Sequence, residues 1–458
     1  MNTLKLAWRN LLRNRRRTLA TLFTMIIGLV AVLLFGGYNR TVQYGLQTGM
    51  VRAGGHLQVQ HRDYFLYGSG NPAAYGIRDY RAVMRLIEND PVLRPMLTVV
   101  TPTLSLGGIA GHYSAGASRT VVARGSEVEA QNRLRRWDDY GFNDKRKPVA
   151  LTGTAPNAAV IGTGVARVLQ LCAAFQLKDC APPPAATGGQ DLPADLAALS
   201  AAAPPAGGRD DRIELLAATA AGAPNVARLQ VAKVESQGIK ELDDMYVGLH
   251  LRQAQQLVYG QGEPMVTAIV LQLRHTAQIP AASERLRQLF ATTLRGQPLA
   301  VHDFATLQPQ YGQITGMFGT IFGFLAVLIA CVALFTIGNT MNMVVLERTV
   351  EIGTLRAMGL RRRGIQRLFL CEGWLLGLGG GALGIAMALL LAWLINHAGL
   401  TWLPPGQVDP SPILVRVWGE WRMMAVTAGG LMAMALLSSW WPARRAAAAN
   451  IVEALRHA

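Results

Sequence analysis

The sequence has few of the residues that mark common enzymatic and metal-binding sites. Its 458 residues include four cysteines and eight histidines, and none of these are clustered at the spacing of zinc ligands. Lysines are few, and none lies in the Gly-x-x-x-x-Gly-Lys-Ser/Thr segment that binds ATP phosphates. The Gly-x-Ser-x-Gly turn of a hydrolase nucleophile is absent as well. We therefore predict that this chain is not an enzyme and holds no metal or cofactor of its own.

Acidic residues are also scarce: 28 Asp and Glu stand against 44 Lys and Arg, a net charge of +16. A basic chain suggests nucleic-acid binding, but here the basic residues flank long apolar runs. Such flanks are typical of the cytoplasmic ends of membrane spans. We therefore predict contact with membrane lipid, no nucleic-acid partner and cytoplasmic termini. The flanking residues are Lys5, Arg9, Arg13, Arg15, Arg16, Arg17, Arg348, Arg356, Arg361, Arg362, Arg363, Arg367, Arg444 and Arg445.

Long apolar runs occur four times, and each reaches the roughly 20 residues needed to cross a hydrocarbon core. The pattern predicts a membrane protein with four transmembrane helices, one N-terminal and three C-terminal. A large periplasmic α+β domain is expected between the first two helices. The predicted segments are a cytoplasmic amphipathic helix at 1–17, spans at 18–38, 313–345, 368–396 and 422–442, a periplasmic domain at 39–312, a cytoplasmic loop at 346–367, a periplasmic loop at 397–421 and a cytoplasmic tail at 443–458.

Within the external domain, apolar periodicity switches between that of strands and that of helices. A segment rich in Pro, Ala and Gly near 180–208 has little capacity to form a packed core, which predicts an insertion. Strands are predicted at 56–61, 98–106, 118–124, 212–216, 226–234, 266–273 and 299–304, and helices at 80–88, 160–170, 249–259 and 283–294.

The four cysteines divide into two pairs. Cys331 and Cys371 lie in apolar spans, where a thiol packs as a small apolar group. Cys172 and Cys180 lie eight residues apart in the external domain. In an oxidising compartment these two could close a short disulfide loop, and the alternative is two unpaired thiols.

Glycines recur at four-residue steps in the second and third spans, which lets helices approach closely in lipid. Whether the partner helix belongs to this chain or to a second copy stays open. The glycines assigned to such packing are Gly319, Gly323, Gly373, Gly377, Gly381 and Gly384.

The cytoplasmic loop contains a short amphipathic segment. Ile352, Leu355 and Met358 recur at three-residue steps and predict one apolar edge of a helix, while Arg348 and Glu351 have the spacing of a helical ion pair. A solvated loop has no need of such an edge, so we predict that the helix docks a soluble cytoplasmic protein. The residues assigned to it are Glu347, Glu351, Ile352, Leu355, Arg356, Met358 and the C-terminal cap Gly359.

The sequence ERTVEIGTLRAMG at 347–359, with FLCEG at 369–373, resembles the FtsX-type permease domain of MacB-, LolC- and LolE-like ABC transporters. Residues 4–17 are similar to the amphipathic first helix of that family, and PARRA at 442–446 with EALR at 453–456 to its ending. Asn450 stands where the family often has proline. The external domain matches weakly, and its segments 55–60 and 244–256 look most like the LolC/LolE-type subgroup.

This resemblance implies a permease in a bacterial inner membrane, paired with a second copy or a paralogue and with two copies of a cytoplasmic ATPase. ATP and Mg would bind to that ATPase, and none to this chain. The family transmits ATP-driven dimer closure to the periplasm, where a lipoprotein, lipid or amphipathic substrate is exported or extracted, in some cases with a periplasmic adaptor or lipoprotein carrier. The alternative is an FtsX-like signal transducer that controls a periplasmic cell-wall hydrolase. The large external domain favours transport.

Overall fold

The computed structural model describes residues 3–68, 70–142, 147–177, 211–403, 406–408 and 410–448. Two compact units are present. The helical unit comprises Met1–Gly45, Gly312–Trp402 and Pro412–Ala458, and the α/β unit comprises Leu46–Tyr311 and Leu403–Ser411. The Pro/Ala/Gly-rich segment at 180–208, Cys180 and Asn450 lie outside the described residues.

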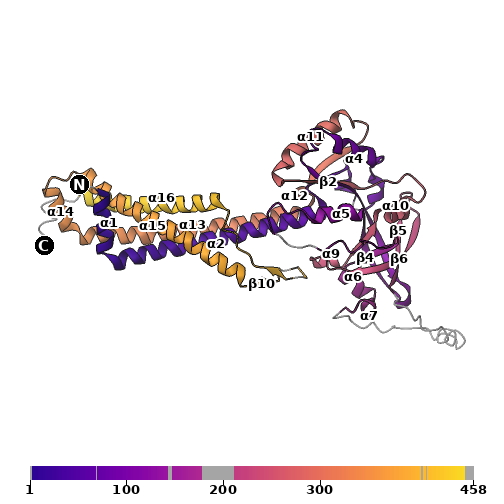
Figure 1. Ribbon diagram of the computed structural model, residues 1–458, viewed down its shortest axis with the longest axis horizontal. Helices are drawn as coiled ribbons and strands as arrows, with labels where there is room; N and C mark the ends of the chain where they lie inside the picture. Colours follow the sequence, from indigo (N-terminus) through magenta and orange to yellow (C-terminus); the bar gives the residue numbers. More distant parts are fainter. Residues whose placement is uncertain are drawn as a thin grey trace. The chain divides into compact units, whose positions relative to one another are not determined.

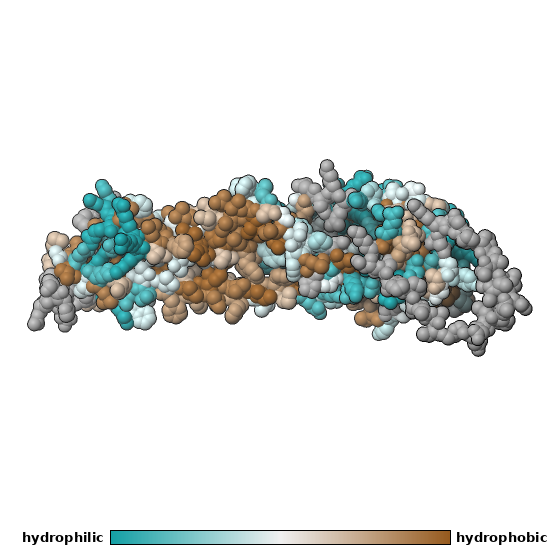
Figure 2. Space-filling view, turned by 90° about the horizontal axis from the view of Figure 1, so that it is seen from below, coloured by the Kyte–Doolittle hydropathy of each residue, from teal (hydrophilic) through white to brown (hydrophobic). Residues whose placement is uncertain are grey.

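Long helices make up most of the helical unit, and they contain all four predicted spans (Figure 1). Among the described residues, four helices are long and apolar enough to cross a membrane: α2, α13, α15 and α16. Apolar side chains gather along this unit in Figure 2, with hydrophilic ones at its end near the N-terminus. The helices are α1 (Thr3–Arg13), α2 (Arg15–Gly54), α13 (Pro309–Glu347), α14 (Thr349–Ala357), α15 (Arg362–His397) and α16 (Trp421–Ala448).

The N-terminal amphipathic helix is shorter than predicted. It ends at Arg13, and α2 begins at Arg15, so the predicted helix over 1–17 is interrupted at Asn14. The hydroxyl of Thr18 donates a hydrogen bond to the carbonyl of Leu11 (2.9 Å). This bond satisfies a carbonyl that the end of α1 leaves without an intrahelical donor, and so stabilises the break.

The α/β unit is built on one mixed nine-stranded sheet in the described part of the chain. Six of its strands form a closed ring in the order β2-β3-β7-β4-β6-β5, because β2 pairs with both β3 and β5. β8, β1 and β9 extend the sheet from the first half of β2. The strands are β1 (Leu57–His61), β2 (Leu97–His112), β3 (Ala117–Ser126), β4 (Ala158–Ile161), β5 (Arg212–Ala218), β6 (Pro224–Val234), β7 (Tyr246–His250), β8 (Ala268–Leu273) and β9 (Leu299–Asp303).

The 16-residue strand β2 joins the ring to the extension. Its first half pairs with β8, and its second half pairs with β3 and β5. At Gly108 a Cβ atom would come within 2.6 Å of the carbonyl oxygen of Leu216 in β5. Glycine therefore allows the close backbone approach that closes the ring.

Helices cover the sheet, and α4, α10 and α11 lie close to where periodicity predicted helices. The prediction of a helix over 160–170 is wrong at its start, because Val160 and Ile161 lie in the buried strand β4 and α6 begins only at Thr163. Both residues are β-branched and pack between β6 and β7, which favours a strand. The helices of this unit are α3 (Tyr64–Tyr67), α4 (Tyr80–Asn89), α5 (Val128–Arg135), α6 (Thr163–Val168), α7 (Cys172–Phe175), α9 (Lys240–Asp243), α10 (Leu251–Tyr259), α11 (Ile279–Thr292) and α12 (Phe304–Leu307).

Candidate functional site

The loop between α13 and α15 contains a well-defined short helix, α14. Gly359, with φ +93°, ends it in the left-handed conformation that glycine adopts without strain. The N–H of Gly359 donates to the carbonyl of Arg356 (3.0 Å), and that of Leu360 to the carbonyl of Leu355 (3.0 Å). This pair of bonds is the Schellman motif, so the predicted C-terminal cap is present.

The three apolar residues predicted to form one edge of α14 lie in different environments. Ile352 is 5% exposed and packs against residues of α13, α15 and α16, among them Phe369 and Ala443. Leu355 is half-buried, as is Arg356, whereas Met358 is 72% exposed. Ile352 therefore anchors α14 to its own chain and offers no surface to another protein.

The exposed apolar side of α14 is a different one. Val350, Thr354 and Met358 are exposed and follow one another at four-residue steps, so they share one helix face. Leu346, at the end of α13, is 62% exposed one turn before Val350. We call Leu346, Val350, Thr354 and Met358 the α14 ridge.

A buried polar cluster lies beside this ridge. Arg348, the N-cap residue of α14, contacts Glu372 of α15 through Nη1 and Oε1 (3.2 Å), and both side chains are under 10% exposed. Asn10 of α1 donates from Nδ2 to the same Oε1 (2.8 Å) and accepts from Arg348 Nη2 at its backbone carbonyl (3.3 Å). These three residues, the Arg348 cluster, link α1, the start of α14 and α15.

The predicted ion pair between Arg348 and Glu351 is wrong. Arg348 turns inward to Glu372, and Glu351 pairs with Arg13 of α1 instead. Glu347 pairs with Arg17 at the start of α2. Both glutamate pairs are substantially exposed and contribute at most about 1 kcal/mol each. Glu347 and Glu351, which were predicted to contact the docked protein, are therefore already paired with arginines of the N-terminal segment.

The span glycines predicted for close packing fall into two groups. Those of α15 meet helices of the same chain: Gly373, Gly377 and Gly381 face α16, and Gly384 faces Leu29 of α2. A Cβ at Gly377 would come within 2.8 Å of the sulfur of Met432. Gly319 and Gly323 of α13 have no such neighbour within 4 Å in the described part of the chain, so their packing role stays a prediction.

The cysteines are described in part. Cys172 is disulfide-bonded, and its predicted partner Cys180 lies outside the described residues. Cys331 and Cys371 are free thiols.

Sequence reasoning did not assign a role to the Arg348 cluster. One signal was available, since Glu372 is an acidic residue inside an apolar span, and such residues face protein partners rather than lipid. Its partners could not be identified from the sequence because Asn10 is 362 residues away along the chain.

Four membrane-length helices and a mixed α/β unit define an integral membrane protein. Residues 323–451 match the family model of the FtsX-like permease C-terminal domain. The chain is 24% identical over 229 residues to an uncharacterized ABC transporter permease of Methanocaldococcus jannaschii, covering 50% of this chain and 55% of the relative. The chain is thus similar to ABC transporter permeases of the MacB/FtsX-like type.

Two further relatives match shorter regions. The macrolide export ATP-binding/permease protein MacB of Escherichia coli is 33% identical over 139 residues, 30% of this chain and 21% of the relative. The ABC transporter permease YtrF of Bacillus subtilis is 32% identical over 152 residues, 30% of this chain and 32% of the relative. The chain thus spans about half or less of the curated relatives it matches.

Proposed function

We propose that this chain is the permease subunit of a transporter whose ATPase is a separate protein that docks on the α14 ridge. The observation that supports this is the two-sided character of α14. Its inner side is anchored by Ile352 and by the Arg348 cluster, and its outer side presents Val350 and Met358 to solvent. A short helix that is rigidly held and apolar on its outer face fits a groove in a soluble partner.

The rigid anchoring makes α14 suited to transmit force. A displacement of the ridge would move α1 and α15 with it, because Arg348 is bonded to both. Unbroken helices α2 and α13 connect the helical and α/β units along the chain. We propose that nucleotide-driven closure of two ATPases at the ridge changes the conformation of the α/β unit on the periplasmic side of a bacterial inner membrane.

The substrate class that we propose is a lipoprotein, lipid or other amphipathic molecule, exported or extracted from the membrane by a dimer of permeases. The basic flanks of the spans support cytoplasmic termini and a cytoplasmic α14. Resemblance to the LolC/LolE-type subgroup stays a prediction, as does a periplasmic adaptor or carrier.

A variant with Met358→Asp tests the docking role. A charge at the centre of an apolar contact is left desolvated and unpaired, so we expect association with the ATPase that co-purifies from native membranes to weaken at least about tenfold. Leu400→Asp, which also replaces an exposed apolar residue of the helical unit with an acid but lies outside α14, is the control. Equal recovery of the ATPase with both variants contradicts the proposal.

A further inference from the structure

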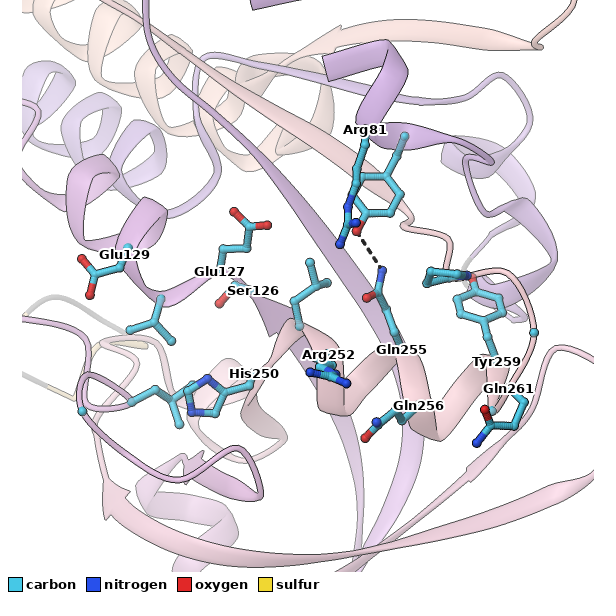
Figure 3. Close-up of a pocket in the computed structure, with 18 residues that line it drawn as sticks. Arg81, Ser126, Glu127, Glu129, His250, Arg252, Gln255, Gln256, Tyr259 and Gln261 are labelled. Atoms are coloured by element: carbon cyan, nitrogen blue, oxygen red, sulfur yellow. Dashed lines mark hydrogen bonds between the residues drawn. The ribbon is translucent and has the colours of Figure 1, made fainter. Parts of the chain in front are cut away.

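The α/β unit contains a solvent-open cavity of about 890 Å³ (Figure 3). Its volume is in the range of small-molecule sites. The cavity lies at the N-terminal ends of three helices, α4, α5 and α10. The first two residues of each helix line it: Tyr80 and Arg81, Val128 and Glu129, and Leu251 and Arg252.

All three helices begin without a side-chain cap. Their N-cap residues are Asp79, Glu127 and His250, and none accepts a hydrogen bond from the first turn through its side chain. Backbone N–H groups in these first turns are therefore open to another acceptor. The dipoles of α4 and α5 also direct positive partial charge toward the cavity, whereas α10 lines it with both its first and its last residues. Such an arrangement favours an anionic group.

Charged side chains of both signs border the cavity. In Figure 3, Arg81 and Arg252 lie on the side of Gln255, while Glu127 and Glu129 lie on the opposite side. The ion pairs found among the described residues involve none of these four charges. The cavity thus holds unpaired charges of both signs in one lining.

An amide held in place by two hydrogen bonds adds to the lining. Gln255 is 8% exposed, and its Nε2 donates to the carbonyl of Met265 (3.1 Å) and to the Tyr80 hydroxyl (3.4 Å). These bonds fix the orientation of the amide. Its Oε1 accepts no hydrogen bond from the described residues and is not among their buried unsatisfied atoms, so it is accessible from the cavity. This atom is therefore available to an N–H of a ligand.

We propose that this cavity binds a zwitterion, a ligand with an ammonium group and a phosphate or carboxylate group. Arg81 and Arg252, with the first turns of α4 and α10, bind the anionic group. Glu127 and Glu129 bind the ammonium group, and Gln255 Oε1 accepts an N–H. A simple anion would be repelled by both carboxylates, and a simple cation by both arginines, so only a ligand with both charges pairs every group.

Calorimetric titration of the full chain, purified in an uncharged maltoside detergent, tests this without any ATPase. The probes are O-phosphoethanolamine and trialanine, which separate a lipid-headgroup source from a peptide source, with inorganic phosphate and ethanolamine as single-charge references. We expect at least one zwitterion to bind more tightly than both references. Equal binding of inorganic phosphate and the zwitterions, or no saturable binding of any probe, overturns the proposal.

Substitutions in the lining test which side chains bind the anionic group of the ligand and which bind its ammonium group. Arg252→Gln removes a charge-assisted hydrogen bond, so we expect binding of the zwitterion to weaken at least about tenfold. Glu127→Gln should reduce the preference over inorganic phosphate, because the ammonium group loses one partner and phosphate loses one repelling carboxylate. Arg85→Gln, on α4 but outside the lining, and Glu241→Gln, on α9, are matched controls that we expect to bind normally. If Arg252→Gln and Glu127→Gln both bind the probes as the unmodified chain does, and unfold at the same temperature, the proposal of a zwitterion site is also overturned.

Discussion

Replacing Arg348 with Met is expected to destabilise the helical unit by about 3–5 kcal/mol, the usual loss when one partner of a buried ion pair is removed. Glu372 would keep only Asn10 as a donor, at 2.8 Å, while its side chain is 3% exposed. A carboxylate in that position has little access to water, and the remaining cation near it, Arg13, is already paired with Glu351. The magnitude follows from the burial of both partners, because an exposed pair is worth at most about 1 kcal/mol.

A double-mutant cycle separates the pair itself from the damage of leaving one charge alone. Glu372→Met leaves the Arg348 guanidinium buried without its carboxylate, so we expect it to lower the unfolding free energy about as much as Arg348→Met. The variant with both substitutions leaves no buried charge unpaired and fills the space with apolar atoms. Its loss of unfolding free energy should therefore be well below the sum of the losses of the two single variants. We expect a coupling free energy of about 3 kcal/mol or more, because the double variant should lose no more stability than either single variant.

The assay is reversible unfolding of the full chain in mixed micelles, titrated with SDS and followed by far-ultraviolet circular dichroism. Arg363→Met, which alters an exposed arginine of α15, is the control and should change stability by less than about 0.5 kcal/mol. Two single substitutions that each lose less than 1 kcal/mol, or whose effects simply add, would refute the inference that the Arg348 cluster holds α1, α14 and α15 together.

Gly373→Ala should lower the unfolding free energy of the helical unit by about 1–3 kcal/mol, because its Cβ would collide with Ser439 of α16. Gly319→Ala should raise helix stability slightly, because its Cβ meets no atom within 4 Å in the described part of the chain. The same SDS titration measures both changes. His56 is fully buried, and desolvation lowers its pKa from 6.5 to about 4. The unfolded chain therefore binds more protons between these two values, so the α/β unit should lose about 2 kcal/mol between pH 7 and pH 5. Hydrogen exchange in β8, whose Leu273 N–H donates to His56 Nδ1 (3.0 Å), measures this loss, and His56→Gln should remove it. A pH dependence unchanged in that variant would contradict the assignment.

The local sequence pattern was sufficient to predict the four membrane-length helices. Each predicted span lies inside one helix, because a run of about 20 apolar residues is a property of adjacent positions and needs no tertiary contact to be recognised. The Gly359 cap is local in the same sense, since only glycine adopts its backbone conformation without strain. Most strands of the α/β unit were also recognisable from alternation, although β4 and β7 were missed because they are short and run directly into helices.

The direction of individual side chains on α14 could not be predicted. Periodicity placed Ile352 and Met358 on one edge, but it does not say which side of a short helix meets the rest of the chain. The packing of α13, α15 and α16 decided that Ile352 is buried and Met358 exposed. The docking surface that we propose therefore contains Val350, Thr354 and Met358 instead of the predicted edge.

By itself, the sequence determined four membrane-length helices, a mixed domain between the first two, and a short capped helix between the second and third spans. Each of these depends on residues within about one helix or strand of each other. Only the tertiary structure decided that Arg348 pairs with Glu372 and Asn10, that β2 closes a ring, and that three helix starts line one cavity. These features depend on residues far apart in the chain, which come together only when apolar surfaces are buried.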